Sequence, residues 1–139
     1  MVSIYTDASV SSGVAIATCM LLSDKAFIGF DTNTYNKVTA SQIGEILAIR
    51  DGLRLYSKSG LSDEDVTLYT DHEYAVKLIA DGDSSKLTDA SDLLEEILEY
   101  VRKYNVCVKH ITAHQMQHNP NKIVDQMSRH RLRRELRRK

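Results

Sequence analysis

The sequence predicts a single α/β domain built around a mixed β-sheet. Three consecutive segments rich in β-branched and apolar residues open the chain, and strand-like segments then alternate with helical ones. Antiparallel strands followed by strand-helix-strand crossovers are typical of an α/β sandwich with a mixed sheet. A chain of 139 residues, 42% of them hydrophobic, is long enough to fold around one core without disulfides.

Five segments are predicted to be strands. The Ser-Ser-Gly sequence at 11–13 indicates a hairpin turn between the first two, and Ser23 and Asp24 join the second to the third. The predicted strands are 2–8, 14–22, 25–31, 65–70 and 106–112.

Four segments have the apolar periodicity of helices. The first has Ser41 or Thr39 as a candidate N-cap and Gly60 just beyond its end. The predicted helices are 41–58, 72–80, 87–104 and a last one that opens at Asn119-Pro120, where proline suits the first turn.

The composition argues against a membrane or secreted protein. No stretch approaches the roughly 18 consecutive apolar residues of a membrane-spanning helix. The N-terminus reaches Asp7 too early for a secretory signal peptide. Cys19 and Cys107 lie in apolar, strand-like segments, which favours buried free thiols over a disulfide. We therefore expect a cytoplasmic protein.

Charge is distributed unevenly, although the formal net charge is only −1. Residues 129–139 hold seven of the 18 basic and one of the 19 acidic side chains, so this segment is +6 and the rest of the chain −7. A basic segment on an acidic body favours contact with a polyanion such as nucleic acid. A basic helix that is merely solvated is the alternative.

Two similar sequences, IYTDAS at 4–9 and LYTDHE at 68–73, place an aspartate after Tyr-Thr. Asp7 and Asp71 both fall at predicted strand ends, the edge of an α/β sheet where ligands bind. In adjacent parallel strands the two carboxylates would lie roughly 5 Å apart, where they repel each other without a proton or a cation. A lone aspartate there is typically a cap or turn residue, but the repetition favours a shared site.

Two further acids are candidates for the same site. Glu45 is the only charged residue of IGEILAI, and small apolar neighbours on its helical face place the carboxylate near a packed surface. Asp125 lies in the first turns of the last predicted helix, where an acid is favourable without any further role. Taken alone, each has a structural explanation.

Together the four acids lie in stretches that resemble ribonuclease H of type 1: IYTDAS, SQIGEILAI, LYTDHEYAVKLI and HNPNKIVDQMSR, in that order across nearly the whole chain. The resemblance implies a three-layer RNase H-like fold, with a five-stranded sheet of order 3-2-1-4-5 flanked by helices. It also implies that Asp7, Glu45, Asp71 and Asp125 gather at one edge of the sheet and bind divalent metal.

The activity implied is hydrolysis of the RNA strand of RNA–DNA hybrids, leaving 3′-hydroxyl and 5′-phosphate ends. Oxygen-only carboxylate sites select hard cations such as Mg²⁺, with Mn²⁺ as a substitute. Two ions about 4 Å apart can straddle a phosphate, one activating water and the other stabilising the leaving oxygen. Asp7 would bridge the two ions, and the other three acids would complete their shells.

The histidines allow a different metal to be considered. His110, His114 and His118 are spaced four apart, but the first lies in a predicted strand and no cysteine pairs with them, which argues against zinc. The resemblance gives His114 a role in proton movement or product release, with His118 as a rival because His114 lies eleven residues before Asp125. His72 would shape the site or touch substrate.

The resemblance also implies which residues contact the substrate, from their positions in the sequence alone. The RNA strand of a hybrid is recognised through its 2′-hydroxyls, and the matching residues are Ser9, Ser41, Gln42, Glu73 and Tyr74. The family often has an amide in place of Glu73, and a carboxylate cannot donate a hydrogen bond to a hydroxyl. Some members also have a basic helical handle between the second and third helices. In this chain that handle is missing, because residues 81–89 form only a short acidic segment. We expect the basic tail, with Arg129 and Arg131, to contact phosphates instead.

Two alternatives of different classes follow from the same residues. A nuclease of this fold could act on another substrate, such as a DNA junction, because fold alone does not fix function. A non-catalytic nucleic-acid-binding module is the second, although converging acids would repel the backbone that it binds. We expect the protein to be a monomer.

Overall fold

The computed structural model describes residues 1–24, 26–62, 65–83 and 90–112. In chain order the elements are β1 (Val2–Ser11), β2 (Val14–Ser23), β3 (Ala26–Asn36), α1 (Ser41–Lys58), β4 (Val66–Thr70), α2 (Glu73–Asp81), α3 (Ser91–Tyr104) and β5 (Cys107–His110). The five predicted strands and the first three predicted helices are present in the predicted order. The helix predicted to open at Asn119-Pro120 lies outside the described residues.

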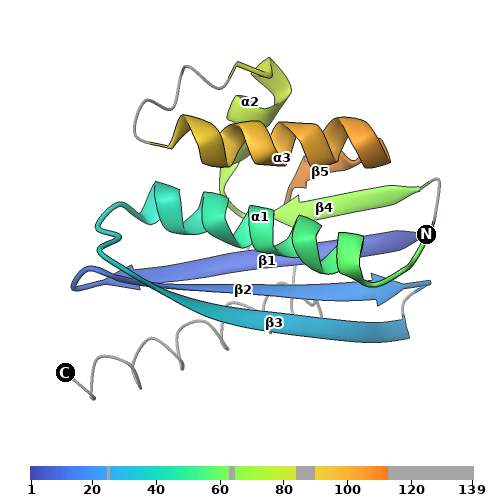
Figure 1. Ribbon diagram of the computed structural model, residues 1–139, viewed down its shortest axis with the longest axis horizontal. Helices are drawn as coiled ribbons and strands as arrows, with labels where there is room; N and C mark the ends of the chain where they lie inside the picture. Colours follow the sequence, from blue (N-terminus) through green and yellow to red (C-terminus); the bar gives the residue numbers. More distant parts are fainter. Residues whose placement is uncertain (25, 63–64, 84–89, 113–139) are drawn as a thin grey trace.

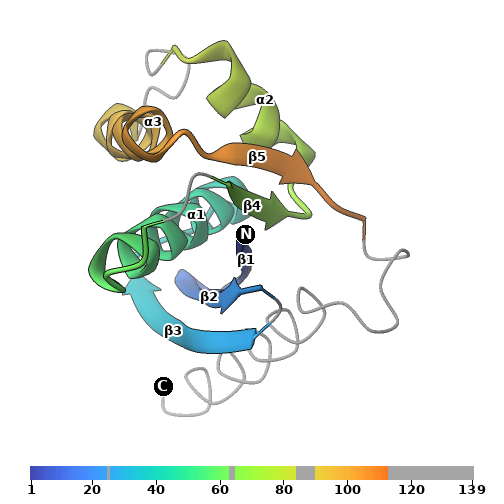
Figure 2. The same ribbon diagram turned by 90° about the vertical axis from the view of Figure 1, so that its right-hand side faces the viewer.

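The strands form one sheet in the order β3-β2-β1-β4-β5. β1 pairs antiparallel with β2 and parallel with β4, while β3 and β5 extend the sheet on either side. α1 lies across one face of the sheet, with α3 beside it (Figures 1 and 2). The predicted strand order and the flanking helices are therefore confirmed.

A two-residue turn sets the register between β1 and β2. Ser12 and Gly13 have φ values of 51° and 76°. Two consecutive positive φ values are typical of a type I′ turn, whose twist matches that of paired strands. The register that follows places Asp7 opposite Thr18 of β2.

β1 and β3 are longer than the sequence predicts. The predicted strands end at residues 8 and 31, but pairing with β2 continues to Ser11 and Asn36. A partner strand supplies backbone hydrogen bonds to polar residues as well, so tertiary pairing overrides local propensity here. The prediction that Asp7 ends its strand is therefore wrong, because this residue lies within β1.

The helix ends also differ from prediction. Ala40 is the N-cap of α1 and no side chain caps that end, so neither Ser41 nor Thr39 has the predicted role. α3 begins at Ser91 rather than at residue 87. None of the helices in the described ranges is both long and apolar enough to cross a membrane.

The two cysteines are free thiols, as predicted, but only one of them is buried. Cys19 lies in β2, which is covered along most of its length. Cys107 is exposed, contrary to prediction, because β5 is an edge strand of the described sheet and its first and last residues are exposed to solvent. Apolar sequence neighbours indicated a strand correctly, but they do not distinguish an edge strand from a central one.

An apolar core joins α1 and α3 to the sheet. Fully burying an aliphatic side chain stabilises the fold by roughly 1.5–3 kcal/mol. The most deeply buried members of this core include Ile4, Leu21, Ile46, Ile49, Leu53, Leu68, Leu94 and Ile97. On the outer side, Arg54 of α1 donates two hydrogen bonds to the Glu96 carboxylate of α3, at 2.6 and 2.8 Å.

A buried carboxylate ties α1 to β3. Asp51 is 4% exposed and accepts hydrogen bonds from the Tyr35 hydroxyl at 2.7 Å, from Asn33 Nδ2 at 3.1 Å and from Arg50 Nη2 at 3.3 Å. Burial, and then the bond to Asp51, raises the pKa of Tyr35 to about 12, so its hydroxyl remains a donor at neutral pH. This network fixes the rotation of α1 about its own axis.

Two glycines allow α1 to lie very close to β1. A β-carbon at Gly52 would lie 2.8 Å from Ile4 Cγ2 and 2.9 Å from Thr6 Cγ2, and one at Gly44 would lie 2.6 Å from Val10 Cγ2. These methyl groups belong to β-branched side chains, which are stiff at χ1 and have little room to move in a packed sheet. The separation of helix and strand is therefore set by the missing side chains.

We predict that Gly52→Ala destabilises the protein. The cost of overpacking, about 1–3 kcal/mol, should exceed the gain of about 1 kcal/mol from the better helix propensity of alanine. Denaturant unfolding should show a net loss of about 1 kcal/mol. Gly29→Ala, in β3, is a control for crowding alone, because a β-carbon there meets nothing within 4 Å. Equal or greater stability of Gly52→Ala would contradict the close approach.

Candidate metal centre

Two neighbouring strands deliver the two aspartates. β1 and β4 pair in parallel, and their ladder ends at the pair Thr6–Thr70. Asp7 and Asp71 are the next residues on each side, so the register brings both carboxylates to the same place. β1 continues beyond Asp7 in its pairing with β2, whereas Asp71 lies in the turn between β4 and α2.

The Tyr-Thr pairs before the aspartates fasten the two strands together. The Tyr5 and Tyr69 rings stack with centroids 4.9 Å apart and an interplanar angle of 15°. Thr6 donates from Oγ1 to the Tyr69 carbonyl at 3.4 Å. Burial, with a smaller effect of Tyr69, raises the pKa of Tyr5. The register thus pairs the tyrosine and the threonine of each motif with their counterparts across the two strands.

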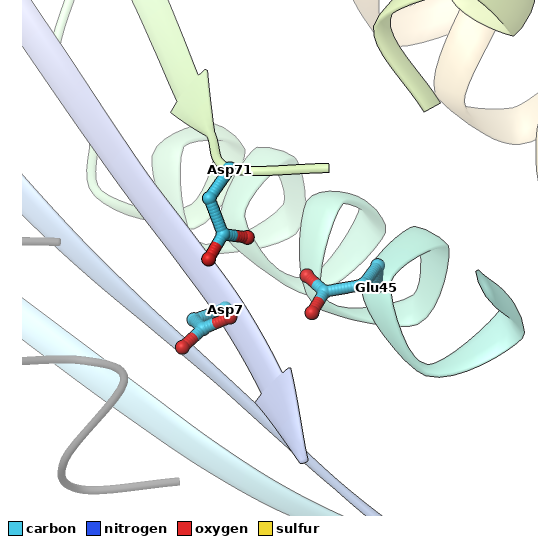
Figure 3. A group of neighbouring side chains, drawn as sticks. All are labelled: Asp7, Glu45 and Asp71. Carbon is cyan, nitrogen blue, oxygen red and sulfur yellow. The ribbon is translucent and has the colours of Figure 1, made fainter. Parts of the chain in front are cut away.

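α1 supplies a third carboxylate. Glu45 follows Gly44, one of the two positions where the missing side chain lets the helix lie close to β1. Figure 3 shows Asp7, Glu45 and Asp71 converging from β1, α1 and the end of β4. One oxygen atom of each residue lies within 4.8 Å of the others. Asp7 is 2% and Glu45 8% exposed, so Asp71, which is partly exposed, is the member most open to solvent.

The three carboxylates fit a hard divalent cation. Negative groups this close need a proton or a cation to offset their repulsion. Their donor set is oxygen only, which suits Mg²⁺ or Mn²⁺ and does not match metals that prefer nitrogen or sulfur ligands. The burial of Asp7 and Glu45 reduces screening by water and strengthens attraction to a cation. The predicted fourth acid, Asp125, lies outside the described residues.

Hydrogen bonds hold the turn that carries Asp71. The His72 amide donates to Thr70 Oγ1 at 3.2 Å, and His72 Nδ1 accepts from the Ala75 amide at 3.3 Å, which caps α2. An accepting Nδ1 requires a neutral ring, and burial, assisted by His110 and opposed by Asp71, lowers the pKa of His72. On the other side of the turn, His110 Nε2 lies 3.2 Å from the Asp71 carbonyl oxygen. No pattern in the sequence indicates this second contact.

The residues implied to touch substrate lie in the two elements that carry Asp7 and Glu45 and in the helix that follows Asp71: Ser9 in β1, Ser41 and Gln42 in α1, and Glu73 and Tyr74 in α2. Glu73 and Tyr74 are exposed in the first turn of α2, and the Glu73 carboxylate lies 3.6 Å from Lys77 Nζ. The predicted residues outside the described part of the chain are His114, His118, Asp125, Arg129 and Arg131.

Comparison with known proteins identifies the family. A family model described as RNase H matches residues 1–133. The chain belongs to the RNase H family. The prediction of a ribonuclease H, made from four short stretches, is thereby confirmed. A search of curated proteins finds no match.

Solved structures, two of them of RNase H1 proteins, share the fold of this chain. RNase H1 of the halophilic archaeon Halobacterium salinarum NRC-1 aligns with a TM-score of 0.75 and 17% identity, over 89% of this chain and 91% of that one. LC11-RNase H1 in complex with an RNA/DNA hybrid aligns with a TM-score of 0.73 and 16% identity, over 91% and 99%. The prototype foamy virus protease-reverse transcriptase aligns with a TM-score of 0.75 and 16% identity, over 93% of this chain and 20% of that one. At these identities the likeness shows the RNase H fold alone.

We predict that Asp71→Asn leaves metal-free stability unchanged or raised, because one source of carboxylate repulsion is removed. It should also abolish most of the stabilisation by Mn²⁺, which is about 2.7 kcal/mol for a ligand at one hundred times its Kd. Thermal unfolding with and without Mn²⁺ measures both effects. Glu99→Gln makes the same charge change on an exposed part of α3 and should keep the Mn²⁺ effect. Loss of metal-free stability in Asp71→Asn would make Asp71 a structural residue.

Proposed function

We propose that this protein hydrolyses the RNA strand of RNA–DNA hybrids by a metal-dependent reaction that leaves 3′-hydroxyl and 5′-phosphate ends. The observation that carries the proposal is the convergence of three carboxylates within 4.8 Å on an RNase H-family sheet. The structure of LC11-RNase H1 with an RNA/DNA hybrid supports the choice of substrate class.

Asp7, Glu45 and Asp71 would hold the metal, with Asp125 as a fourth ligand. Two Mg²⁺ ions, or Mn²⁺ in their place, would activate water and neutralise charge on the scissile phosphate when bound. Asp7 would hold the metal from a buried position within a continuous strand. Asp71 is the most exposed of the three, so its side of the cluster suits the approach of substrate.

Other residues would bind the substrate or transfer a proton. His114, or His118 in its place, would move a proton or help product leave. The hybrid would lie over the first turns of α1 and α2, where Ser41, Gln42, Glu73 and Tyr74 lie, and near Ser9. The tail with Arg129 and Arg131 would contact phosphates. We propose a cytoplasmic monomer as the working form.

We predict that the protein with Mg²⁺ or Mn²⁺ cuts a labelled RNA strand internally only when the strand is paired with DNA. The same strand alone and in duplex RNA provides the comparison, and gel analysis of the products locates the cuts and the end groups. Asp71→Asn should abolish cleavage, because a metal ligand is removed, while Glu99→Gln should not. Hybrid binding without any cleavage would favour a binding module instead.

We predict that removal of residues 129–139 weakens hybrid binding and flattens its dependence on salt. The slope of log K against log salt concentration should fall by about 0.9 for each phosphate that the tail neutralises in the intact protein. Binding titrations at several salt concentrations measure this slope. Arg102→Gln removes an exposed cation from α3 and serves as the control. A slope unchanged by truncation would exclude the tail from phosphate binding.

A further inference from the structure

We propose that His110 is a positioning residue for Asp71, which it holds through the main-chain carbonyl group. The inference rests on the proposed function, because it assigns a role within the same metal centre. His110 Nε2 lies 3.2 Å from the Asp71 carbonyl oxygen, which is within hydrogen-bonding distance.

Asp71 needs such an anchor more than Asp7 does. Asp7 lies inside β1, and its pairing with Thr18 of β2 continues the sheet on that side. Asp71 follows the last ladder pair of β4, so regular strand pairing no longer fixes its peptide group. The hydrogen bonds of the flanking residues and the one with His110 hold the turn instead.

The register between β4 and β5 places the His110 imidazole beside the turn that carries Asp71. Thr70 and His110 form the last pair between β4 and β5, so His110 lies beside the point where the strand becomes a turn. The Ile111 amide donates to the Thr70 carbonyl at 2.9 Å, which pins the residue just before Asp71. The last residue of β5 and the residue after it thus hold two successive carbonyl groups, His110 through its side chain and Ile111 through its backbone amide.

The chemistry of the contact determines which replacements preserve it. A carbonyl oxygen only accepts, so His110 Nε2 must carry the hydrogen. The neutral ring with hydrogen on Nε2 and the charged ring both satisfy this requirement. Glutamine places an amide nitrogen the same number of bonds from the backbone, whereas asparagine is one bond shorter. Phenylalanine keeps a flat ring and removes the donor.

Removal of this hydrogen bond should weaken metal binding. Groups that orient metal ligands typically contribute 10- to 100-fold in metal affinity. His110 is exposed and acts on the backbone of Asp71 rather than on its carboxylate, so we expect the lower end of that range, about tenfold.

Titration calorimetry with Mn²⁺ alone, on the full chain, tests the proposal. His110→Phe and His110→Asn should each raise the Kd for Mn²⁺ about tenfold, and His110→Gln should restore a value near that of the wild type. The Mg²⁺ concentration for half-maximal hybrid cleavage should rise in parallel, while kcat at saturating Mg²⁺ changes little. Lys109→Gln alters the neighbouring exposed residue of β5 and should leave the Kd unchanged.

Failure of this inference is distinguishable from failure of the proposed function. A wild type that binds Mn²⁺ and cuts hybrid, with a Kd unchanged in His110→Phe and His110→Asn, would overturn the positioning role alone. Lower stability of those variants at an unchanged Kd would do the same, since it would mark a purely structural contact. A wild type that neither binds Mn²⁺ nor cuts hybrid would overturn both.

Discussion

The rest of the structure depends on the close approach of α1 to β1. Gly44 and Gly52 leave no β-carbon between the helix and the stiff methyl groups of the strand. The same helix carries the core residues that cover the sheet and, one position after Gly44, the Glu45 carboxylate. A helix held further away would leave both a looser core and a carboxylate out of reach of Asp7. The packing of the core and the position of the Glu45 carboxylate therefore both depend on the absence of side chains at Gly44 and Gly52.

The parallel pairing of β1 and β4 brings Asp7 and Asp71 together, but the two aspartates have different backbone surroundings. Asp7 belongs to a strand that continues in the ladder with β2, while Asp71 lies where β4 gives way to α2. The buried network around Asp51 holds α1, and with it Glu45, against β3. Each acid of the site is thus positioned by a different kind of contact: strand pairing, helix packing and the hydrogen bonds of a turn.

Much of this arrangement could be predicted from the sequence, because hydrophobic periodicity and short sequence motifs indicate local structure well. The order of strands and helices along the chain is of this kind, whereas the adjacency of the first and fourth strands and the place of Glu45 at the metal site are implied by the resemblance to ribonuclease H. The extensions of β1 and β3 could not be predicted, since polar residues become strand only through a distant partner. The contact of His110 with Asp71 depends on the register between β4 and β5, which no local pattern encodes.

The unequal exposure of the two cysteines has a practical consequence for chemical labelling. The thiolate is the form of cysteine that attacks labelling reagents, and burial raises the pKa of the Cys19 thiol, whose Sγ atom also lies 3.8 Å from the Asp31 carbonyl. Cys107 is exposed on β5, the strand that borders the one leading to Asp71. The chain therefore offers a single exposed thiol for a fluorophore or spin label, on the strand next to β4, without any engineered substitution.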